Sequence, residues 1–132
     1  FCKGCLACLK VGHCVIADDA VEIAAKMHDS DVIVFATPVY YYSVSGQLKT
    51  VLDRANPLYD SDYAFTKVYL LATAAEDAPY VVEGATKAVQ GWVDCFGRCE
   101  LVDTVFAGGV NDIGDIAGHP ALDKAYRIGK EI

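Results

Sequence analysis

Short runs of consecutive apolar residues alternate with amphipathic segments along this chain, and that alternation constrains its fold more than any other feature. A continuous apolar run such as residues 32–36 is typical of a strand in a parallel sheet that is covered on both faces. Apolar positions spaced three and four residues apart predict the helices between such strands. We therefore predict strands at 32–36, 68–72 and 101–107, and helices at 19–27, 44–55, 81–96 and 120–132.

Residues that favour the ends of helices and strands set the expected boundaries. Helix starts are marked by Asp19 with Glu22, by Ser43 or Ser45, and by Pro120. Gly97 is expected to end the third helix, and Thr37-Pro38 the first strand. Asp103 interrupts the third apolar run, which indicates a strand at the edge of the sheet.

Strands that alternate with helices are joined by right-handed crossovers, so we predict a doubly wound parallel α/β sheet. Ligands of such sheets bind beyond the carboxyl ends of the strands. In this chain those ends are residues 37–43, 73–77 and 107–112. The sheet topology therefore predicts the place of a ligand site.

Composition narrows the class of protein. Of the 132 residues 54% are hydrophobic and 22% charged, which predicts one domain with a packed core. The formal net charge of −7 argues against nucleic acid or an anionic membrane as a partner. No apolar stretch has the length of a membrane span, and the start of the chain lacks the pattern of a signal peptide. We therefore expect a cytoplasmic protein.

Four of the six cysteines crowd the first fourteen residues, at Cys2, Cys5, Cys8 and Cys14. Thiols at three-residue steps, with a fourth after a short loop, are typical of ligands to a four-iron cluster. Zinc sites usually separate two cysteine pairs more widely, and disulfides are rare in the cytosol. The remaining alternative is four reduced thiols that bind nothing. We interpret His13 as a surface residue, and Cys95 and Cys99 as small buried side chains.

The segment from Thr37 to Ser43 combines a proline with three consecutive tyrosines at a strand end. Pro38 restricts the backbone, which leaves neighbouring amides able to donate to a planar heteroaromatic ring, and tyrosines suit the flanks of such a ring. The alternative is that they cover the end of the sheet or pack at a subunit contact. Asp53-Arg54 is interpreted as an ion pair or exposed cation at a helix end. No nucleophile–base pair is evident, so we predict no catalytic side chain.

The order and spacing of these motifs resemble those of the flavodoxin-like NAD(P)H-dependent FMN reductases and, within them, the iron–sulfur flavoproteins. The similarity spans nearly the whole chain. It begins with the cysteine run leading into Asp18-Asp19 and continues in Ala36-Thr37-Pro38-Val39-Tyr40 and Lys49-x-x-x-Asp53-Arg54. Its last parts are Gly114-Asp115-Ile116 and the segment from Ala121-Leu122 through Ala125-Tyr126 to Gly129-Lys130.

The resemblance implies a flavodoxin-like, three-layer α/β/α domain that binds FMN at the strand ends. The residues it implies as FMN contacts are Thr37, Pro38, Val39, Tyr40, Tyr41 and Ser43 in the first loop, and Thr73, Ala74, Ala75 and Glu76 in the second. It also implies a homodimer or homotetramer in which a neighbouring protomer closes the flavin site.

The chain departs from the family pattern in two respects. The family's first strand, its phosphate-binding turn, its first helix and its second strand precede the cysteine run and are absent here. We therefore expect residues 1–132 to be the C-terminal two-thirds to three-quarters of one domain, with the strand at 32–36 an exposed apolar edge. Ala74-Ala75 also stands where relatives often carry a glycine.

Three functions remain open at this point. The first is an FMN-dependent oxidoreductase that passes electrons from NAD(P)H to a quinone, a flavin or an iron acceptor. The second is an iron–sulfur flavoprotein for one-electron transfer with a ferredoxin-like partner, in which Cys2, Cys5, Cys8 and Cys14 hold the cluster. The third is a non-catalytic module whose cysteines bind zinc.

Overall fold

Four strands form one mixed sheet in the computed structural model, which describes residues 1–132. The strands are β1 (Val32–Tyr40), β2 (Ser43–Val44), β3 (Lys67–Thr73) and β4 (Glu100–Ala107). Their order in the sheet is β2-β1-β3-β4, with β1, β3 and β4 parallel and β2 antiparallel to β1. The predicted α/β sheet is confirmed, and the short antiparallel strand β2 is an addition to it.

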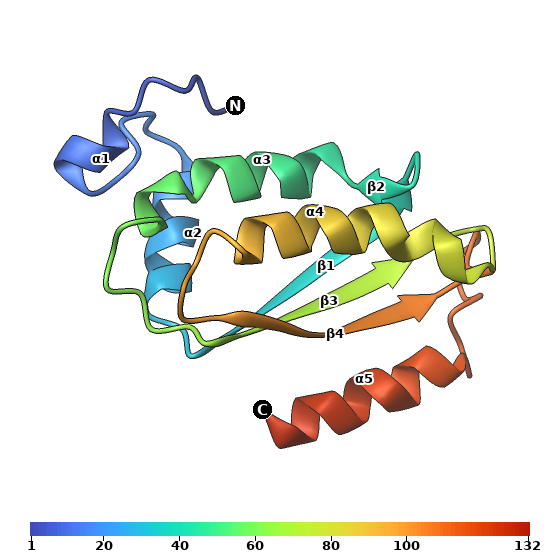
Figure 1. Cartoon of the computed structure of the whole chain (residues 1–132). Coiled ribbons are helices and arrows are strands. Elements are labelled where there is room, and N and C mark those ends of the chain that lie inside the picture. The colour runs from blue at the N-terminus through green and yellow to red at the C-terminus, as the bar shows by residue number, and fades with distance from the viewer.

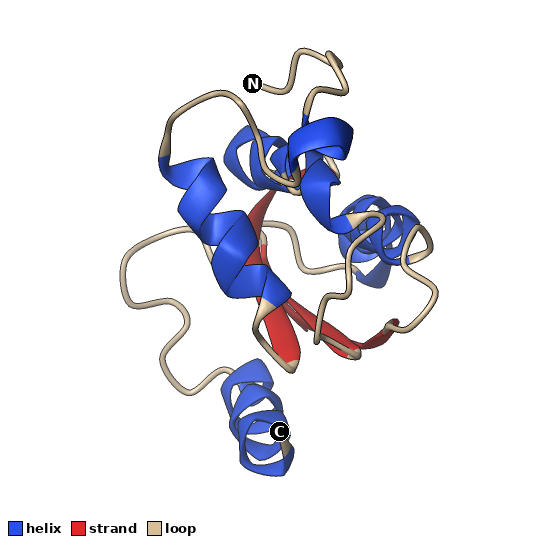
Figure 2. Ribbon diagram, turned by 90° about the vertical axis from the view of Figure 1, so that its left-hand side faces the viewer, coloured by secondary structure: helices blue, strands red, loops and turns tan.

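Helices cover both faces of this sheet. They are α1 (Cys8–Val11), α2 (Asp19–His28), α3 (Gly46–Arg54), α4 (Glu83–Val93) and α5 (Pro120–Glu131), with two short 3-10 helices, η1 (Asn56–Leu58) and η2 (Pro79–Val82). Helices α3 and α4 lie on one face, α2 packs beside α3, and α5 lies on the opposite face (Figures 1 and 2). The molecule therefore has three layers, one of which contains α5 alone.

The main core lies between the sheet and helices α3 and α4. Strand β3 lies between β1 and β4 and contributes buried residues on both faces: Val68 and Leu70 are 0% exposed on one face, and Tyr69 is 7% exposed on the other. Phe65 stacks on Tyr63, with 4.2 Å between ring centroids, and on Trp92 of α4 at 5.8 Å. These aromatic rings pack the start of β3 against α4.

Strand β1 is longer than expected, because Thr37-Pro38 does not end it. Pro38 is paired in parallel register with Thr73, and the strand continues to Tyr40. Proline is tolerated in a strand where one side has no partner. Strand β2 pairs only with Val39 and Tyr40, so β1 has such an open side at Pro38.

Two predicted helix boundaries were wrong and two were confirmed. Helix α2 is capped by Asp18, not Asp19, and α4 ends at Val93, four residues before Gly97. Of the two candidate serines, Ser45 caps α3, since its hydroxyl accepts a hydrogen bond from the Leu48 amide at 3.2 Å. Helix α5 begins at Pro120 as expected.

Helix α5 is fastened to the edge strand β4 by polar contacts. The Nζ atom of Lys124 lies 2.8 Å from a carboxylate oxygen of Asp103 and donates to the carbonyl of Thr104 at 3.1 Å. Strand β4 is at the edge of the sheet, as Asp103 predicted. The charged residue in this apolar strand is thus the partner of a lysine on the helix that covers it.

Strand β1 leaves apolar surface uncovered. Its side away from β3 has no neighbour over residues 32–38, because β2 pairs only further along. Val34, on the face away from α3 and α4, is 47% exposed. The expected exposed apolar edge is confirmed. None of the helices combines the length and apolar character that spanning a bilayer requires.

Candidate functional site

A strained hairpin stands at the carboxyl ends of the strands (Figure 1). Its turn consists of Tyr41 and Tyr42, because Tyr40 pairs with Ser43. Both turn residues have positive φ, 48° and 59°, the combination that a type I′ turn requires. Asparagine and glycine adopt it far more readily than tyrosine, so the backbone here is strained. Tyr41 is fully exposed at the tip.

Glu76 joins this hairpin to the loop that follows β3. The Tyr42 hydroxyl donates to one carboxylate oxygen of Glu76 at 3.1 Å, and the Tyr80 hydroxyl donates to the other. These hydrogen bonds, together with the negative charge of Glu76, raise the pKa of both phenols. The carboxylate therefore holds two neutral tyrosines from different segments beside each other.

Gly84 in the first turn of α4 determines how closely the hairpin approaches. A Cβ atom at this position would lie 1.9 Å from the carbonyl oxygen of Tyr42. Contacts under 3.0 Å are essentially never seen for real Cβ atoms, so glycine is required for this packing. Gly84 was not singled out from the sequence, although a lone glycine inside a helical pattern is the signal that marks it.

Thr37 stabilises the base of the hairpin. Its hydroxyl donates to the carbonyl of Pro38 at 2.7 Å and accepts from the amide of Ser45 at 2.9 Å. The residue is 5% exposed. Its hydroxyl thereby couples the end of β1 to the start of α3.

The loops after β3 and β4 are held together at the same end of the sheet. The Ala74 amide donates to the carbonyl of Ala107 at 3.0 Å, and the Val110 amide donates to the carbonyl of Ala74 at 2.9 Å. Gly108 packs so closely that an added Cβ would lie 2.7 Å from the Cα of Asp77. This glycine, too, was missed from the sequence.

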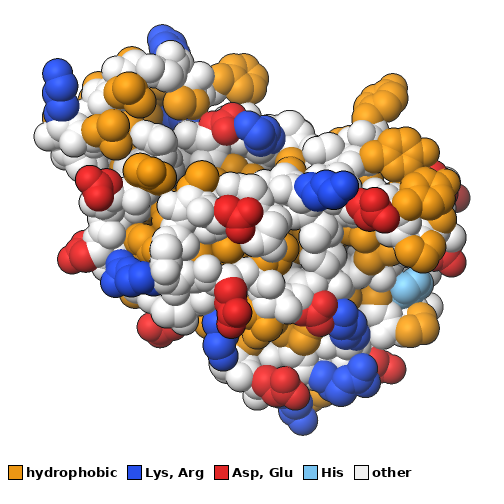
Figure 3. All heavy atoms as spheres, in the orientation of Figure 1, with side chains coloured by type: hydrophobic (Ala, Val, Ile, Leu, Met, Phe, Trp, Pro, Cys, Tyr) orange, Lys and Arg blue, Asp and Glu red, His pale blue; other side chains and the backbone are white.

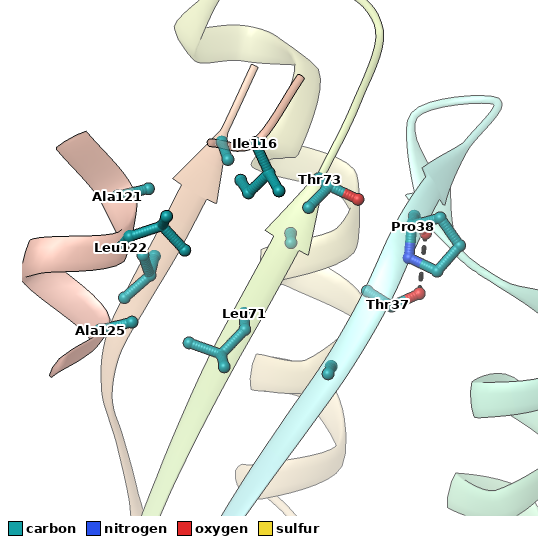
Figure 4. Close-up of a pocket in the computed structure, with 12 residues that line it drawn as sticks. Thr37, Pro38, Leu71, Thr73, Ile116, Ala121, Leu122 and Ala125 are labelled. Atoms are coloured by element: carbon teal, nitrogen blue, oxygen red, sulfur yellow. Dashed lines mark hydrogen bonds between the residues drawn. The ribbon is translucent and has the colours of Figure 1, made fainter. Parts of the chain in front are cut away.

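An apolar cavity of about 390 Å³ opens beside these loops, between the sheet and α5. Figure 4 shows Leu71 and Thr73 of β3 on one side, Leu122 on α5 opposite, and Ile116 near the end of the strand. Thr37 and Pro38 line it from β1. Size and apolar lining match those of cavities that take up a small organic ligand.

The ten residues that were predicted to contact FMN all lie in this region of the structure. Three of them line the apolar cavity: Thr37, Pro38 and Thr73. The others belong to the hairpin strands or the loop after β3: Val39 and Ser43 are half-buried, Ala74 is buried, and Tyr40, Tyr41, Ala75 and Glu76 are exposed. Their contact with FMN stays a prediction.

A second site lies in the loop that carries the first four cysteines. Cys2, Cys5, Cys8 and Cys14 line one cavity of about 90 Å³. In this arrangement no group of three cysteine, histidine or acidic side chains is placed to hold a single metal ion. The cavity is closed on its other side by the end of α3 and by η1, through Arg54, Asn56 and Pro57.

Arg54 is buried and joins α3 to this loop, so neither predicted alternative, a local ion pair with Asp53 or an exposed cation, is correct: its ion pair is with Asp18. It is 3% exposed, and its guanidinium donates to both carboxylate oxygens of Asp18 at 2.6 and 2.8 Å. It also donates to the carbonyl of Ile16 at 3.1 Å and to Sγ of Cys14 at 3.2 Å. The hydrogen bonds from Arg54 lower the pKa of Asp18. Asp53, in contrast, pairs with the exposed Lys49.

The remaining cysteines and the loop histidine differ in their surroundings. Asn56 donates to Sγ of Cys8 at 3.1 Å. Cys99 is half-buried against the core, and burial raises its pKa. Cys95 is exposed, so the prediction that it is buried was wrong. His13 is exposed, as predicted.

The two candidate sites stand at opposite ends of α3 (Figure 1). The hairpin precedes its first residue, while Arg54 at its last residue faces the cysteines. Nine residues at 1.5 Å each make this helix about 14 Å long. Within one chain, the cysteine cavity and the strand ends are therefore not in contact. In Figure 3 apolar side chains gather at both ends of the molecule.

Comparison with known proteins agrees with this architecture. The family model described as NADPH-dependent FMN reductase matches residues 2–99. An iron–sulfur flavoprotein from Archaeoglobus fulgidus is 30% identical over 133 residues, which cover 100% of this chain and 58% of that relative. The chain thus spans little more than half the length of this curated relative.

Solved structures with similar folds share less sequence. The Trp repressor binding protein from Bacillus subtilis has a TM-score of 0.69 and 21% identity, covering 83% of this chain and 74% of that chain. An NAD(P)H:quinone oxidoreductase from Methanothermobacter marburgensis has a TM-score of 0.61 and 18% identity, covering 91% of this chain and 66% of that chain. These likenesses confirm the flavodoxin-like fold.

Proposed function

This chain belongs to the NADPH-dependent FMN reductase family, and on that basis we propose that it is an oxidoreductase that binds FMN at the carboxyl ends of β1 and β3. The proposed reductant is NAD(P)H, and the proposed acceptor is a quinone, a second flavin or an iron compound. The similarity to an iron–sulfur flavoprotein along the whole chain supports the same class of reaction.

The observation that carries the proposal is the apolar cavity next to the strained hairpin. A flat ring with a polar rim needs an apolar surface and nearby backbone amides. Thr37, Pro38 and Thr73 lie on the cavity wall, and residues 39–43 and 74–76 follow them directly along the chain. The residues present therefore fit the isoalloxazine ring, and we propose the ten predicted contacts as its binding residues.

When bound, FMN supplies hydride and single-electron chemistry that side chains do not have. The protein contributes binding, orientation and electrostatics. Glu76 accepts hydrogen bonds from two tyrosine hydroxyls, so its part is to fix the hairpin. We assign no general acid or base at this site.

We propose further that Cys2, Cys5, Cys8 and Cys14 hold a four-iron cluster. All four line one cavity, and two of the sulfurs already accept N–H donors from outside the loop, as ligand sulfurs do. A cluster of several irons spaces its thiolates more widely than one ion does. The cluster would supply one-electron chemistry and suit a ferredoxin-like partner.

We propose a cytoplasmic homodimer or homotetramer without a nucleic-acid or membrane partner. The net charge of −7 opposes binding to phosphate backbones and anionic lipids. The cysteine cavity and the strand ends lie at opposite ends of α3 in one chain. Electrons therefore pass over a short distance between the two sites only if a neighbouring protomer contributes one of them. Light scattering coupled to size-exclusion chromatography measures the oligomeric state.

An absorbance spectrum of the full-length protein, purified without oxygen and supplied with excess FMN, tests the proposal. Flavin bands that persist after desalting support the reductase, and a broad shoulder of iron–sulfur absorbance beneath them adds the cluster. A colourless sample that contains zinc would instead identify a non-catalytic zinc module. A protein that retains no FMN at saturation refutes the proposed function, whatever its metal content.

A further inference from the structure

Two side chains from outside the cysteine loop donate hydrogen bonds to its sulfur atoms. Arg54 Nε lies 3.2 Å from Sγ of Cys14, and Asn56 Nδ2 lies 3.1 Å from Sγ of Cys8. The donors are 40 and 48 residues away along the chain from the cysteines that they reach. An N–H group that points at sulfur stabilises the negative charge that a metal-bound thiolate carries.

The orientation of Arg54 is determined by its other hydrogen bonds. Two of its nitrogens hold both oxygens of Asp18, and one of them also reaches the carbonyl of Ile16. Because this fork is planar and 3% exposed, Nε is left facing Cys14. The arginine thereby fastens the segment that leads from the last cysteine into α2, whose first turn Asp18 caps.

Asn56 lies just after α3, on the same side of the cysteine cavity as Arg54. It follows Arg54 by two residues and opens η1, where its carbonyl accepts a hydrogen bond from the Tyr59 amide at 3.1 Å. Its side chain is half-buried and lines the cavity that all four cysteines share. The end of α3 and the start of η1 thus present two donors to two different sulfurs.

The other two cysteines lack this support. Cys2 accepts a hydrogen bond at 3.5 Å from the amide of Gly4, within its own loop. The loop itself is exposed and contains only one short helix, α1. The cavity wall made by α3 and η1 is therefore the part of the site that can impose a geometry on the thiols.

We propose that Arg54 and Asn56 are positioning residues of the cysteine site, which orient the Cys14 and Cys8 sulfurs into the shared cavity and donate N–H hydrogen bonds to them as metal ligands. This inference rests on the proposed four-iron cluster, and it adds that retention and reduction potential of the cluster depend on side chains of α3 and η1.

The test compares three variants of the full-length protein after anaerobic reconstitution with iron and sulfide. Asn56→Asp keeps the shape of the side chain but replaces the N–H donor by an acceptor. Arg54→Lys keeps the charge but cannot hold Asp18 and Cys14 together. Lys49→Met is the control, since Lys49 lies on the same helix in an exposed pair with Asp53.

Loss of iron to a chelator and the reduction potential followed by electron paramagnetic resonance are the readouts. Removal of a partner that orients a metal ligand typically weakens metal retention about 10- to 100-fold. We expect such a loss in Asn56→Asp and Arg54→Lys, a lower reduction potential in Asn56→Asp, and wild-type values in Lys49→Met. FMN binding, measured by fluorescence, should be the same in all of them.

The outcomes separate this inference from the proposed function. Equal iron retention and potential in wild type and Asn56→Asp would overturn the inference and leave both proposed cofactors in place. A wild-type protein that binds FMN but never iron overturns the inference and the cluster, but not the flavin enzyme. If Arg54→Lys fails to fold, as circular dichroism would show, Asn56→Asp decides the question.

Discussion

Replacing Gly84 by alanine tests the packing that places the hairpin at the strand ends. The added methyl would lie 1.9 Å from the carbonyl oxygen of Tyr42, whereas such contacts do not fall below 3.0 Å. The hairpin and α4 must therefore separate by at least 1.1 Å, the difference between these two distances. A shift of this size at the turn displaces the backbone next to the proposed FMN ring.

The expected free-energy change follows from two opposing effects. Alanine stabilises a helix by about 1 kcal/mol relative to glycine. Overpacking typically costs about 1–3 kcal/mol. Gly91 lies in the same helix with nothing within 4 Å of an added Cβ, so Gly91→Ala experiences the first effect alone. We expect Gly84→Ala to be about 1–3 kcal/mol less stable than Gly91→Ala.

Urea unfolding of the two variants measures this difference directly, and a fluorescence titration measures FMN affinity. Gly84→Ala should bind FMN more weakly than wild type, and Gly91→Ala should bind it equally well. If both alanines stabilise the protein to the same extent and leave FMN affinity unchanged, then Gly84 does not determine the position of the hairpin.

Three further predictions concern the supports of the two sites. Ser45→Ala should lower the free energy of unfolding by about 1 kcal/mol, because α3 loses its N-cap; a change within error in urea unfolding would contradict this. The pKa of Asp18 lies below its ordinary 3.8, so its bond to Arg54 stabilises the fold fully above pH 3.8 and less as the pH falls through the lower, folded value. In Asp18→Asn, the free energy of unfolding should therefore no longer show this decrease at acid pH, which unfolding measured over a series of pH values would reveal. Asp29 and Asp62 raise the pKa of His28 above 6.5, so its stabilising effect is complete below pH 6.5 and disappears as the pH rises through the folded value. In Asp62→Asn, NMR titration of the imidazole should show a lower pKa, and an unchanged value would disprove the pairing.

Local sequence patterns predicted the three parallel strands, the helices α2 to α5 and the family. The runs at 32–36, 68–72 and 101–107 lie within the observed strands β1, β3 and β4. The prediction that the first run is covered on both faces was wrong, because burial alternates along β1 and Val34 is 47% exposed on the face away from α3 and α4. The boundary errors have local causes too. Pro38 ends a strand only where a hydrogen bond is required of it, and in β1 the open side removes that requirement.

The candidate sites were predicted less completely. The four cysteines are close in sequence, so their shared cavity could be expected. The contact of Arg54 with them could not, because an arginine at the end of an amphipathic helix looks the same in sequence whether it meets water or a carboxylate 36 residues earlier. The tyrosine pair at the hairpin turn was expected as part of a loop, while its positive φ and its bonds to Glu76 were not.

By itself the sequence determined the α/β sheet and the grouping of thiols, since each depends on spacing along a few consecutive residues, and from the sheet it predicted a ligand site at the strand ends. The tertiary structure decided which side chains became supports: the burial of Arg54, the close approach of Gly84 to Tyr42, and the donation from Asn56 to Cys8. Each of these contacts joins residues that only the packing of α3, α4 and η1 brings together. The energy of these contacts depends on distances of a few ångströms between residues far apart in sequence, so no repeating pattern of residues predicts them.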